Sequence, residues 1–252
     1  KQVVRLRDGR ELFIPGAERD KTGAIRRRAR PVDAAARRRA ERLGLGTRRA
    51  ASLLLTGRPR AEWVAAAGGR AGRLPGSLRW PVTNGWFVRG FGSGKGGYHL
   101  AVDIAGEIGW NVRAAAPGVV GYSGDGVKGY GNIVMVVHPG GWVTIYAHNS
   151  VNFVVAGQRV RRGQILAELG STGISRGPHV HFEFVHRGRM CDPAALFRPG
   201  IRHRSGKLSP IRRAEWTDPG SRPRAVDCRP RRKYPGSKRV ADETSELAGE
   251  DG

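Results

Sequence analysis

Short runs rich in Val, Ile, Tyr and Phe recur between about Leu78 and Phe197, and glycines punctuate them at close intervals. The chain has 38 glycines among its 252 residues, which favours tight turns and short strands over long helices. Within this region, the runs 132–137 and 142–147 flank a His-Pro-Gly-Gly turn sequence and predict a β-hairpin. We therefore expect a mainly β domain over residues 78–200.

The segments on either side of this β region differ from it in composition. Residues 1–30 predict a short hairpin or extended segment, with an Asp-Gly turn between two apolar runs. Residues 31–75 are rich in Ala, Arg and Leu, and the helix breakers around Gly44 divide them into a small helical region. Residues 201–252 are first basic and then acidic and lack hydrophobic periodicity, so we expect a disordered tail there.

The formal net charge of +24 predicts an attraction to polyanions. Nucleic acid, anionic lipid head groups and anionic cell-wall polymers all qualify, and a surplus of Arg over Lys can also reflect a GC-rich genome. Nucleic-acid binding would place aromatic residues among arginines on a strand face. The strand faces of this chain carry histidines instead, which argues against a nucleic-acid partner.

Targeting and redox signals in the sequence are sparse. The chain lacks an apolar run of the roughly 18 residues that a transmembrane helix needs, so no membrane span is predicted. It begins with Lys1 and shows no signal peptide, which is typical of a mature or trimmed chain. Cys191 and Cys228 are compatible with one disulfide in an oxidising compartment and equally with two free thiols.

The run 179–184, His-Val-His-Phe-Glu-Phe, alternates strictly between polar and apolar residues. In a β-strand, His179, His181 and Glu183 share one face, and the apolar residues between them share the other face. The apolar face belongs to a core, and two neighbouring histidines on the opposite face indicate a metal or catalytic site. His138, by contrast, lies in the hairpin turn, where we expect a structural or exposed residue.

Two further polar clusters accompany this strand. His99 and Asp103 are four residues apart, so their side chains can converge if the extended backbone between them bends. Imidazole and carboxylate groups are both ordinary zinc ligands. In the run Thr144-Ile145-Tyr146-Ala147-His148, the two-residue period predicts that Tyr146 and His148 share a face with Thr144.

Together, these clusters resemble the lysostaphin-type (LytM-type) zinc metallopeptidases, which cleave peptidoglycan. The resemblance covers a little under half of the chain. It implies an antiparallel β-sandwich with an open groove, which the small helical segment precedes and the expected disordered tail follows. The matching motifs are Phe91-Gly92, His99-x-x-x-Asp103, Ala115-Ala116-Pro117-Gly118-Val119-Val120, Tyr130-Gly131-Asn132, Thr144-x-Tyr146-Ala147-His148, Gly157-Gln158-x-Val160, Gly163-Gln164-x-Leu166, Gly170-Ser171-Thr172-Gly173 and Gly177-Pro178-His179-x-His181-Phe182-Glu183.

The resemblance also implies roles for five side chains. His99, Asp103 and His181 match the family's metal ligands, which implies one Zn²⁺ per chain with water in the fourth position. His148 and His179 match the family's two non-ligand histidines. One would help to deprotonate the water, and the other would hydrogen-bond the water or the developing oxyanion. Because all five are present, the sequence argues against the metal-free regulators that share this fold.

The sequence departs from the family pattern at two positions. Ala101 stands where the family commonly has Gly, and we expect it to tighten the local backbone. Arg176 stands where the family commonly has Thr, and we expect it to add charge at the rim of the cleft and to alter substrate choice. Neither position supplies a metal ligand.

The resemblance implies a zinc-dependent endopeptidase that hydrolyses the peptide crosslinks or bridges of bacterial peptidoglycan. We expect a monomer that is periplasmic, associated with the cell envelope or secreted, and whose basic surface attracts anionic envelope polymers. One alternative is a catalytically silent wall-binding or amidase-activator module of the same fold. Another is a biotinyl or lipoyl carrier domain, since its Gly-Gln motifs also occur here, but the modifiable lysine is missing.

Overall fold

The chain forms two compact units, residues 1–34 and residues 35–252. In the first unit, strand β1 (Gln2–Arg5) pairs antiparallel with β2 (Glu11–Ile14). The computed structural model describes residues 2–5, 11–14, 34–69, 75–94, 97–198, 201–202, 208–209 and 228–230.

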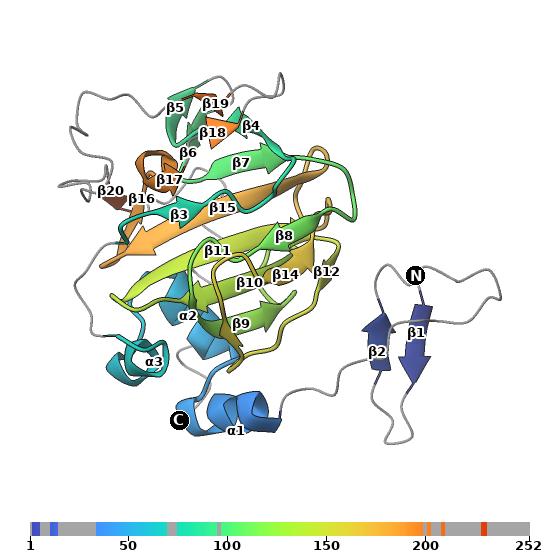
Figure 1. Ribbon diagram of the computed structural model, residues 1–252, viewed down its shortest axis with the longest axis vertical. Coiled ribbons are helices and arrows are strands. Elements are labelled where there is room, and N and C mark those ends of the chain that lie inside the picture. The colour runs from blue at the N-terminus through green and yellow to red at the C-terminus, as the bar shows by residue number, and fades with distance from the viewer. Residues whose placement is uncertain are drawn as a thin grey trace. The chain divides into compact units, whose positions relative to one another are not determined.

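A nine-stranded antiparallel sheet dominates the described part of the second unit (Figure 1). Its main path runs β13-β9-β10-β11-β15-β16-β20, while β7 pairs with β15 and β4 pairs with β7. The predicted hairpin is confirmed, because β10 and β11 pair with Val137 opposite Val143. The strands are β4 (Trp86–Arg89), β7 (Val102–Ala105), β9 (Gly118–Gly124), β10 (Asn132–Val137), β11 (Trp142–Asn149), β13 (Arg159–Val160), β15 (His179–His186), β16 (Arg189–Cys191) and β20 (Cys228–Pro230).

Smaller elements complete the described fold. A three-stranded sheet has the order β12-β14-β8, and the remaining strands form the pairs β5–β6, β3–β17 and β18–β19. A short 3₁₀ helix spans Ala194–Leu196. The strands are β3 (Leu78–Arg79), β5 (Gly92–Gly94), β6 (Gly97–His99), β8 (Asn111–Arg113), β12 (Val151–Asn152), β14 (Ile165–Glu168), β17 (Phe197–Arg198), β18 (Ile201–Arg202) and β19 (Leu208–Ser209).

Each face of the large sheet packs against a different layer. On one face, residues of β15 such as Phe182 form a core with β8 and β14 of the three-stranded sheet, for example Val112 and Leu166. On the other face, Ile145 and Val185 pack with the helices. Burial of apolar side chains on both faces is the main stabilising term for such a layered fold. The mainly β sandwich expected from the sequence is confirmed.

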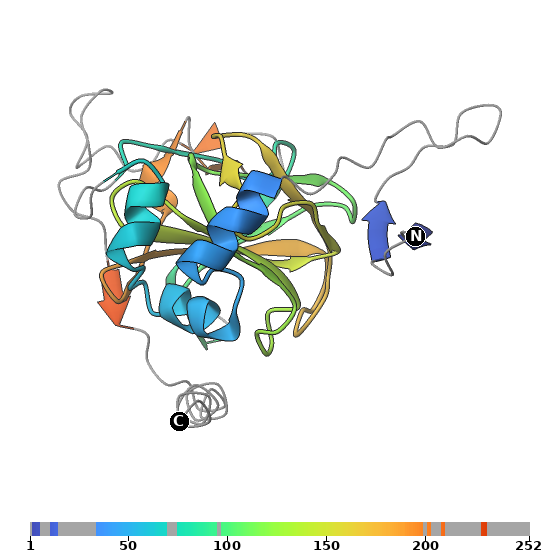
Figure 2. The same cartoon turned by 90° about the horizontal axis from the view of Figure 1, so that it is seen from below.

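Three short helices lie together on one side of the strands (Figure 2). Thr47 caps the second, because its Oγ1 accepts a hydrogen bond from Ala50 N at 3.1 Å. Leu54 of that helix packs so closely on Gly121 of β9 that a Cβ there would lie 2.5 Å from it. The helices therefore share a core with the sheet, and none of those described combines the length and apolarity of a membrane span. They are α1 (Ala34–Leu43), α2 (Arg48–Leu55) and α3 (Ala61–Ala66).

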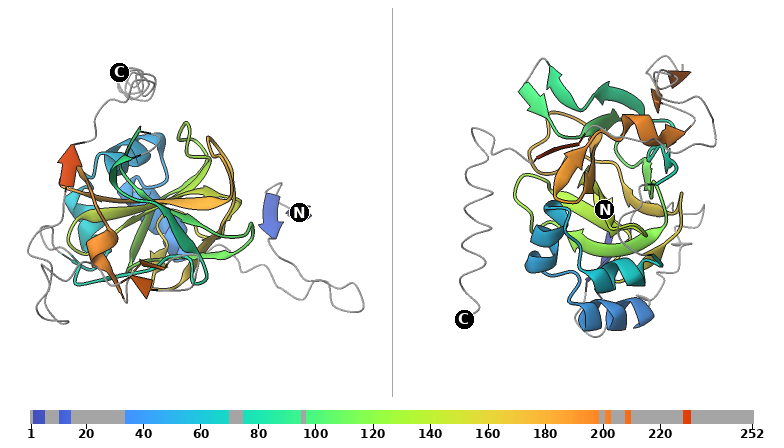
Figure 3. Two further views of the ribbon diagram at one scale, coloured as in Figure 1. Left: turned by 90° about the horizontal axis from the view of Figure 1, so that it is seen from above. Right: turned by 90° about the vertical axis from the view of Figure 1, so that its left-hand side faces the viewer.

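A disulfide joins Cys191 to Cys228, which decides between the two states that the sequence left open. The two cysteines are also directly opposite each other in the β16–β20 ladder. The strand β20 is the red-orange arrow in the left-hand view of Figure 3. Residues 201–202, 208–209 and 228–230 fall within the tail expected to be disordered, but they form the β18–β19 pair and the strand β20, so that expectation is wrong for these seven residues. The remainder of 201–252 lies outside the described residues.

His138 is a buried structural residue at the end of the β10–β11 hairpin. Its ring stacks on Trp142 with centroids 3.8 Å apart. Burial lowers the pKa of His138 to about 3, although the hydrogen bond to the Pro117 carbonyl raises it. In the neutral ring, Nδ1–H donates to Pro117 O at 2.7 Å, and Nε2 lies 2.7 Å from the Thr144 hydroxyl oxygen.

We expect His138 to make folding depend on pH. Unfolded His138 binds a proton near pH 6.5, whereas the folded residue does so only near 3, so the free energy of unfolding falls as the pH drops through that window. Replacing His138 by Gln removes this proton uptake. Urea unfolding at about pH 7 and about pH 4.5 measures this effect. Between these two pH values, the free energy of unfolding falls less for His138→Gln than for the parent. Equal losses in the two proteins would contradict the assignment, since all other titrating groups are shared.

Candidate metal centre

Five polar side chains meet where β6, β7, β11 and β15 come together. His179 and His181 lie on β15, and Asp103 lies directly opposite His181 on β7. His99 ends β6, and His148 lies near the end of β11. All five residues predicted from the sequence are therefore brought to one place by strands from distant parts of the chain.

Three of these side chains present donor atoms at the spacing of a metal site. Asp103 Oδ1 lies 3.0 Å from His181 Nδ1 and 3.2 Å from His99 Nε2. The two imidazole nitrogens are 3.3 Å apart. Tetrahedral ligands at 2.0–2.1 Å from Zn²⁺ are separated by about 3.3 Å, so the donor set fits this ion in number, type and spacing.

The outer atoms of the two histidines are held by hydrogen bonds. His99 Nδ1 lies 3.0 Å from the carbonyl oxygen of Gly90, which can only accept, so Nδ1 carries the proton and Nε2 offers a lone pair. His181 Nε2 lies 3.1 Å from Glu183 Oε1. That carboxylate also accepts a hydrogen bond from the Tyr130 hydroxyl at 2.7 Å. A carboxylate behind a histidine is the usual support of a metal ligand.

Sequence reasoning gave Glu183 and Tyr130 no role. The signal for Glu183 was present, because alternation along the strand places it on the same face as His181. Tyr130 had no such signal, because only the tertiary structure shows that its hydroxyl reaches Glu183.

The electrostatics of the cluster match a site for a cation. Burial raises the pKa of Asp103, but hydrogen bonds from His181 and His99 outweigh this effect and hold the pKa well below its usual value. Burial lowers the pKa of His181, but hydrogen bonds to Asp103 and Glu183 raise it to about 9. Two carboxylates thus favour positive charge on His181, and a bound cation competes with the proton for Nδ1.

His148 reaches this site by leaving the alternation of its strand. Tyr146 packs against Phe182 with ring centroids 5.2 Å apart, on the face opposite His181. The His148 ring instead lies 5.8 Å from that of His181. The backbone of His148 has φ +63°, a left-handed conformation that is costly for a residue other than glycine. The prediction that Tyr146 and His148 share a face is therefore wrong, because this backbone turn redirects the His148 side chain.

His148 and His179 also present free imidazole nitrogens. His148 Nδ1 donates to the carbonyl oxygen of Thr172 at 2.8 Å, and His179 Nδ1 donates to that of Gly177 at 2.8 Å. Burial lowers the pKa of His148 to about 4, although the hydrogen bond to Thr172 opposes this effect. His148 is therefore neutral near pH 7, with Nε2 able to accept a proton. Donor atoms of His148, His179 and His181 lie within 4.8 Å of one another.

The two positions that depart from the family pattern lie close to this cluster in the chain. Ala101 is buried in the bend between β6 and β7. Arg176 is exposed in the segment before β15. Its neighbour Ser175 has Oγ at 3.3 Å from His179 Nδ1.

Residues 97–193 match the model of peptidase family M23. The chain contains a domain of peptidase family M23. The match spans all five residues of the cluster. The M23 domain thus comprises β6, β7 and all strands from β8 to β16, whereas the helices α1–α3 precede it.

Several known proteins are similar to this chain. A lipoprotein NlpD/LppB homologue of Pseudomonas aeruginosa is 41% identical over 123 residues, covering 49% of this chain and 40% of the relative. The murein hydrolase activator NlpD of Escherichia coli is 39% identical over 115 residues, which cover 46% of this chain and 30% of that relative. A putative peptidase M23 structure from Pseudomonas aeruginosa is 29% identical, with a TM-score of 0.44, covering 77% of this chain and 81% of the other. The chain spans less than half the length of the curated relatives it matches.

We expect zinc binding to depend on His181 and on the carboxylate behind it. The parent protein binds one equivalent of Zn²⁺, and His181→Ala binds none because a ligand is lost. Glu183→Gln weakens binding about 10–100-fold, because the neutral amide no longer supports His181 as strongly. Competition with a chromogenic chelator measures both effects, with Ile174→Ala, an exposed apolar residue, as the control. A tightly held equivalent of zinc in His181→Ala would refute the assignment.

Proposed function

We propose that this protein is a zinc-dependent endopeptidase that hydrolyses peptide crosslinks or bridges of bacterial peptidoglycan. The observation that carries the proposal is the donor set of His99, Asp103 and His181, whose inner atoms lie 3.0–3.3 Å apart while the outer nitrogens of both histidines are already hydrogen-bonded. Three protein ligands leave one tetrahedral position open, which is the pattern of catalytic rather than structural zinc sites. One Zn²⁺ per chain would be held there.

A Zn²⁺ ion held by His99, Asp103 and His181 would supply a Lewis acid for the scissile carbonyl and would lower the pKa of a water molecule. The proton transfers fall to the chain itself. His148 is neutral and its tautomer is fixed by Thr172 O, so Nε2 is the base that takes a proton from the attacking water. The Nε2 atom of His179 lies 3.8 Å from Asp103 Oδ1, so this ring nitrogen is placed to hydrogen-bond the water at the site.

Family and relatives support the peptidoglycan substrate and a location in the cell envelope. The curated relatives are named as lipoproteins or as murein hydrolase activators. The disulfide between Cys191 and Cys228 suits an oxidising compartment, such as the periplasm or the exterior. The net charge of +24 would attract anionic envelope polymers to the protein.

A second candidate function rests on the names of those relatives. A chain 39% identical to a murein hydrolase activator can itself act by stimulating a separate hydrolase, with no hydrolysis of its own. A digestion experiment with and without a partner hydrolase distinguishes the two functions. An endopeptidase releases fragments from the wall alone, whereas an activator needs the partner hydrolase.

We expect the parent protein to release peptide fragments from purified sacculi, and a chelator to abolish the release. His148→Ala retains one zinc equivalent but loses about 10²-fold or more of the rate, because the base is missing while the three ligands remain. Mass spectrometry of the fragments identifies the bond that is cut. His203→Ala, in the basic tail of the sequence, is the matched histidine control and keeps the parental rate.

Two outcomes would overturn the endopeptidase proposal. One is parental digestion by His148→Ala and His181→Ala. The other is a zinc-loaded parent that releases nothing alone but stimulates a murein amidase, with or without chelator. The second outcome supports the activator function.

A further inference from the structure

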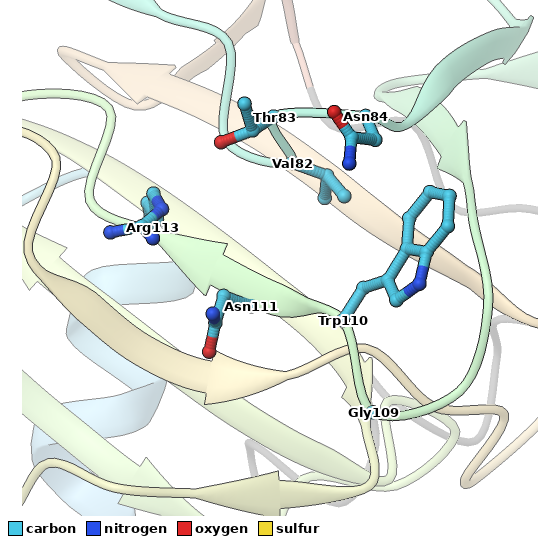
Figure 4. Close-up of a pocket in the computed structure, with 7 residues that line it drawn as sticks. All are labelled: Val82, Thr83, Asn84, Gly109, Trp110, Asn111 and Arg113. Carbon is cyan, nitrogen blue, oxygen red and sulfur yellow. The ribbon is translucent and has the colours of Figure 1, made fainter.

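A hollow of about 360 Å³ lies beside β8, on the side of the sheet that carries the three-stranded layer (Figure 4). The loop before β4 supplies one wall, and β8 with the loop preceding it supplies the other. In Figure 4 the Asn84 amide and the Trp110 indole both face the hollow, with Arg113 across from them. The side chains that characterise it are Val82, Thr83, Asn84, Trp110, Asn111 and Arg113.

The Trp110 indole is held in place before any ligand arrives. The Trp110 carbonyl accepts a hydrogen bond from Leu169 N at 2.8 Å, and Gly109 N donates to Leu169 O at 2.9 Å. The indole also meets Trp86 edge to face, with centroids 6.3 Å apart. A fixed aromatic surface loses little conformational entropy on binding, which favours its use as a recognition platform.

The polar groups that line the hollow are mostly uncharged. Among its described lining residues there is no carboxylate to bind a cation. Its one cationic group, Arg113, already donates a hydrogen bond to Gly163 O at 3.0 Å. Asn84 and Asn111 offer amide donors and acceptors, and Thr83 offers a hydroxyl. A ring with one apolar face and several hydroxyl or amide groups matches this combination, which is the chemistry of an N-acetylated amino sugar.

The hollow lies at the same end of the sheet as the metal centre but on the opposite face, because the His181 side chain points away from the three-stranded layer. Trp86 is opposite Ala105 on β7, and Ala105 is opposite His179 on β15. Neighbouring strands are about 4.8 Å apart, so the backbones of Trp86 and His179 are roughly 10 Å apart. Leu169, which is hydrogen-bonded to the Trp110 backbone, is followed in the chain by Gly170, whose carbonyl accepts a hydrogen bond from His179 N at 3.2 Å. The start of β15 therefore lies between the hollow and the metal centre.

We propose that the hollow around Trp110 and Asn84 binds an N-acetylated amino sugar of the glycan strand. The substrate in this inference rests on the proposed function, but sugar binding by the hollow does not require hydrolysis.

Titration with a soluble β-1,4-linked N-acetylglucosamine tetramer tests the inference on the zinc-loaded full chain. The ligand contains no peptide and cannot be cleaved. The parent shows saturable binding by calorimetry, together with a shift of the Trp110 indole N–H resonance. Trp110→Ala weakens binding at least about tenfold, because it removes the aromatic platform. Asn84→Ala, at an exposed position that should not disturb folding, weakens it about fivefold by removing hydrogen bonds. Ile174→Ala, an exposed apolar residue outside the hollow, leaves affinity unchanged.

The outcomes separate this inference from the proposed function. His181→Ala keeps full affinity for the sugar while losing hydrolysis, and Trp110→Ala keeps the parental rate on a peptide substrate without sugar while losing rate on sacculi. Absence of saturable sugar binding, or equal affinity in the parent and in both hollow variants, would overturn the inference. Tighter binding of a free nucleoside that depends on Trp110 would do the same, because a base would then be the better ligand.

Discussion

The antiparallel register between β7 and β15 is the constraint on which the metal centre depends. It places Asp103 directly opposite His181, and the apolar side chains between these polar residues enter the core with the three-stranded sheet. A slip of one residue would turn every side chain of a strand to the other face. Such a slip would expose Phe182 and bury His181, so the packing of the core enforces the geometry of the site.

Hydrogen bonds to fixed groups then orient the site. Main-chain carbonyls hold the outer nitrogens of His99, His148 and His179, and Glu183 holds that of His181. Each carbonyl can only accept, so it fixes which ring nitrogen keeps the proton. Ligand and base atoms are therefore preorganised by the folded backbone, which lowers the reorganisation needed when a cation or substrate binds.

The residue that departs from regular strand geometry is also one of the predicted catalytic residues. His148 adopts a left-handed backbone conformation, and its N–H donates to Tyr130 O at 2.9 Å. The hydroxyl of the same Tyr130 donates to Glu183, so one residue supports both His148 and His181. Strained conformations persist where the surrounding structure fixes them, and they are common at functional sites. The buried His138 serves structure alone, since it lies on a separate network with Thr144 and Pro117.

The sequence by itself determined the mainly β character of residues 78–200, the β10–β11 hairpin and the face of β15 that carries His179 and His181, because a two-residue period and glycine turns are local properties of the chain. It also provided the histidines and the aspartate whose pattern resembles the zinc peptidases. The tertiary structure alone decided that Glu183 and Tyr130 support the site and that Cys191 bonds to Cys228. It also decided that the His148 side chain turns to the face of His181. Those features depend on contacts between residues far apart in the chain, or on a backbone turn held by such contacts, and no local pattern records them.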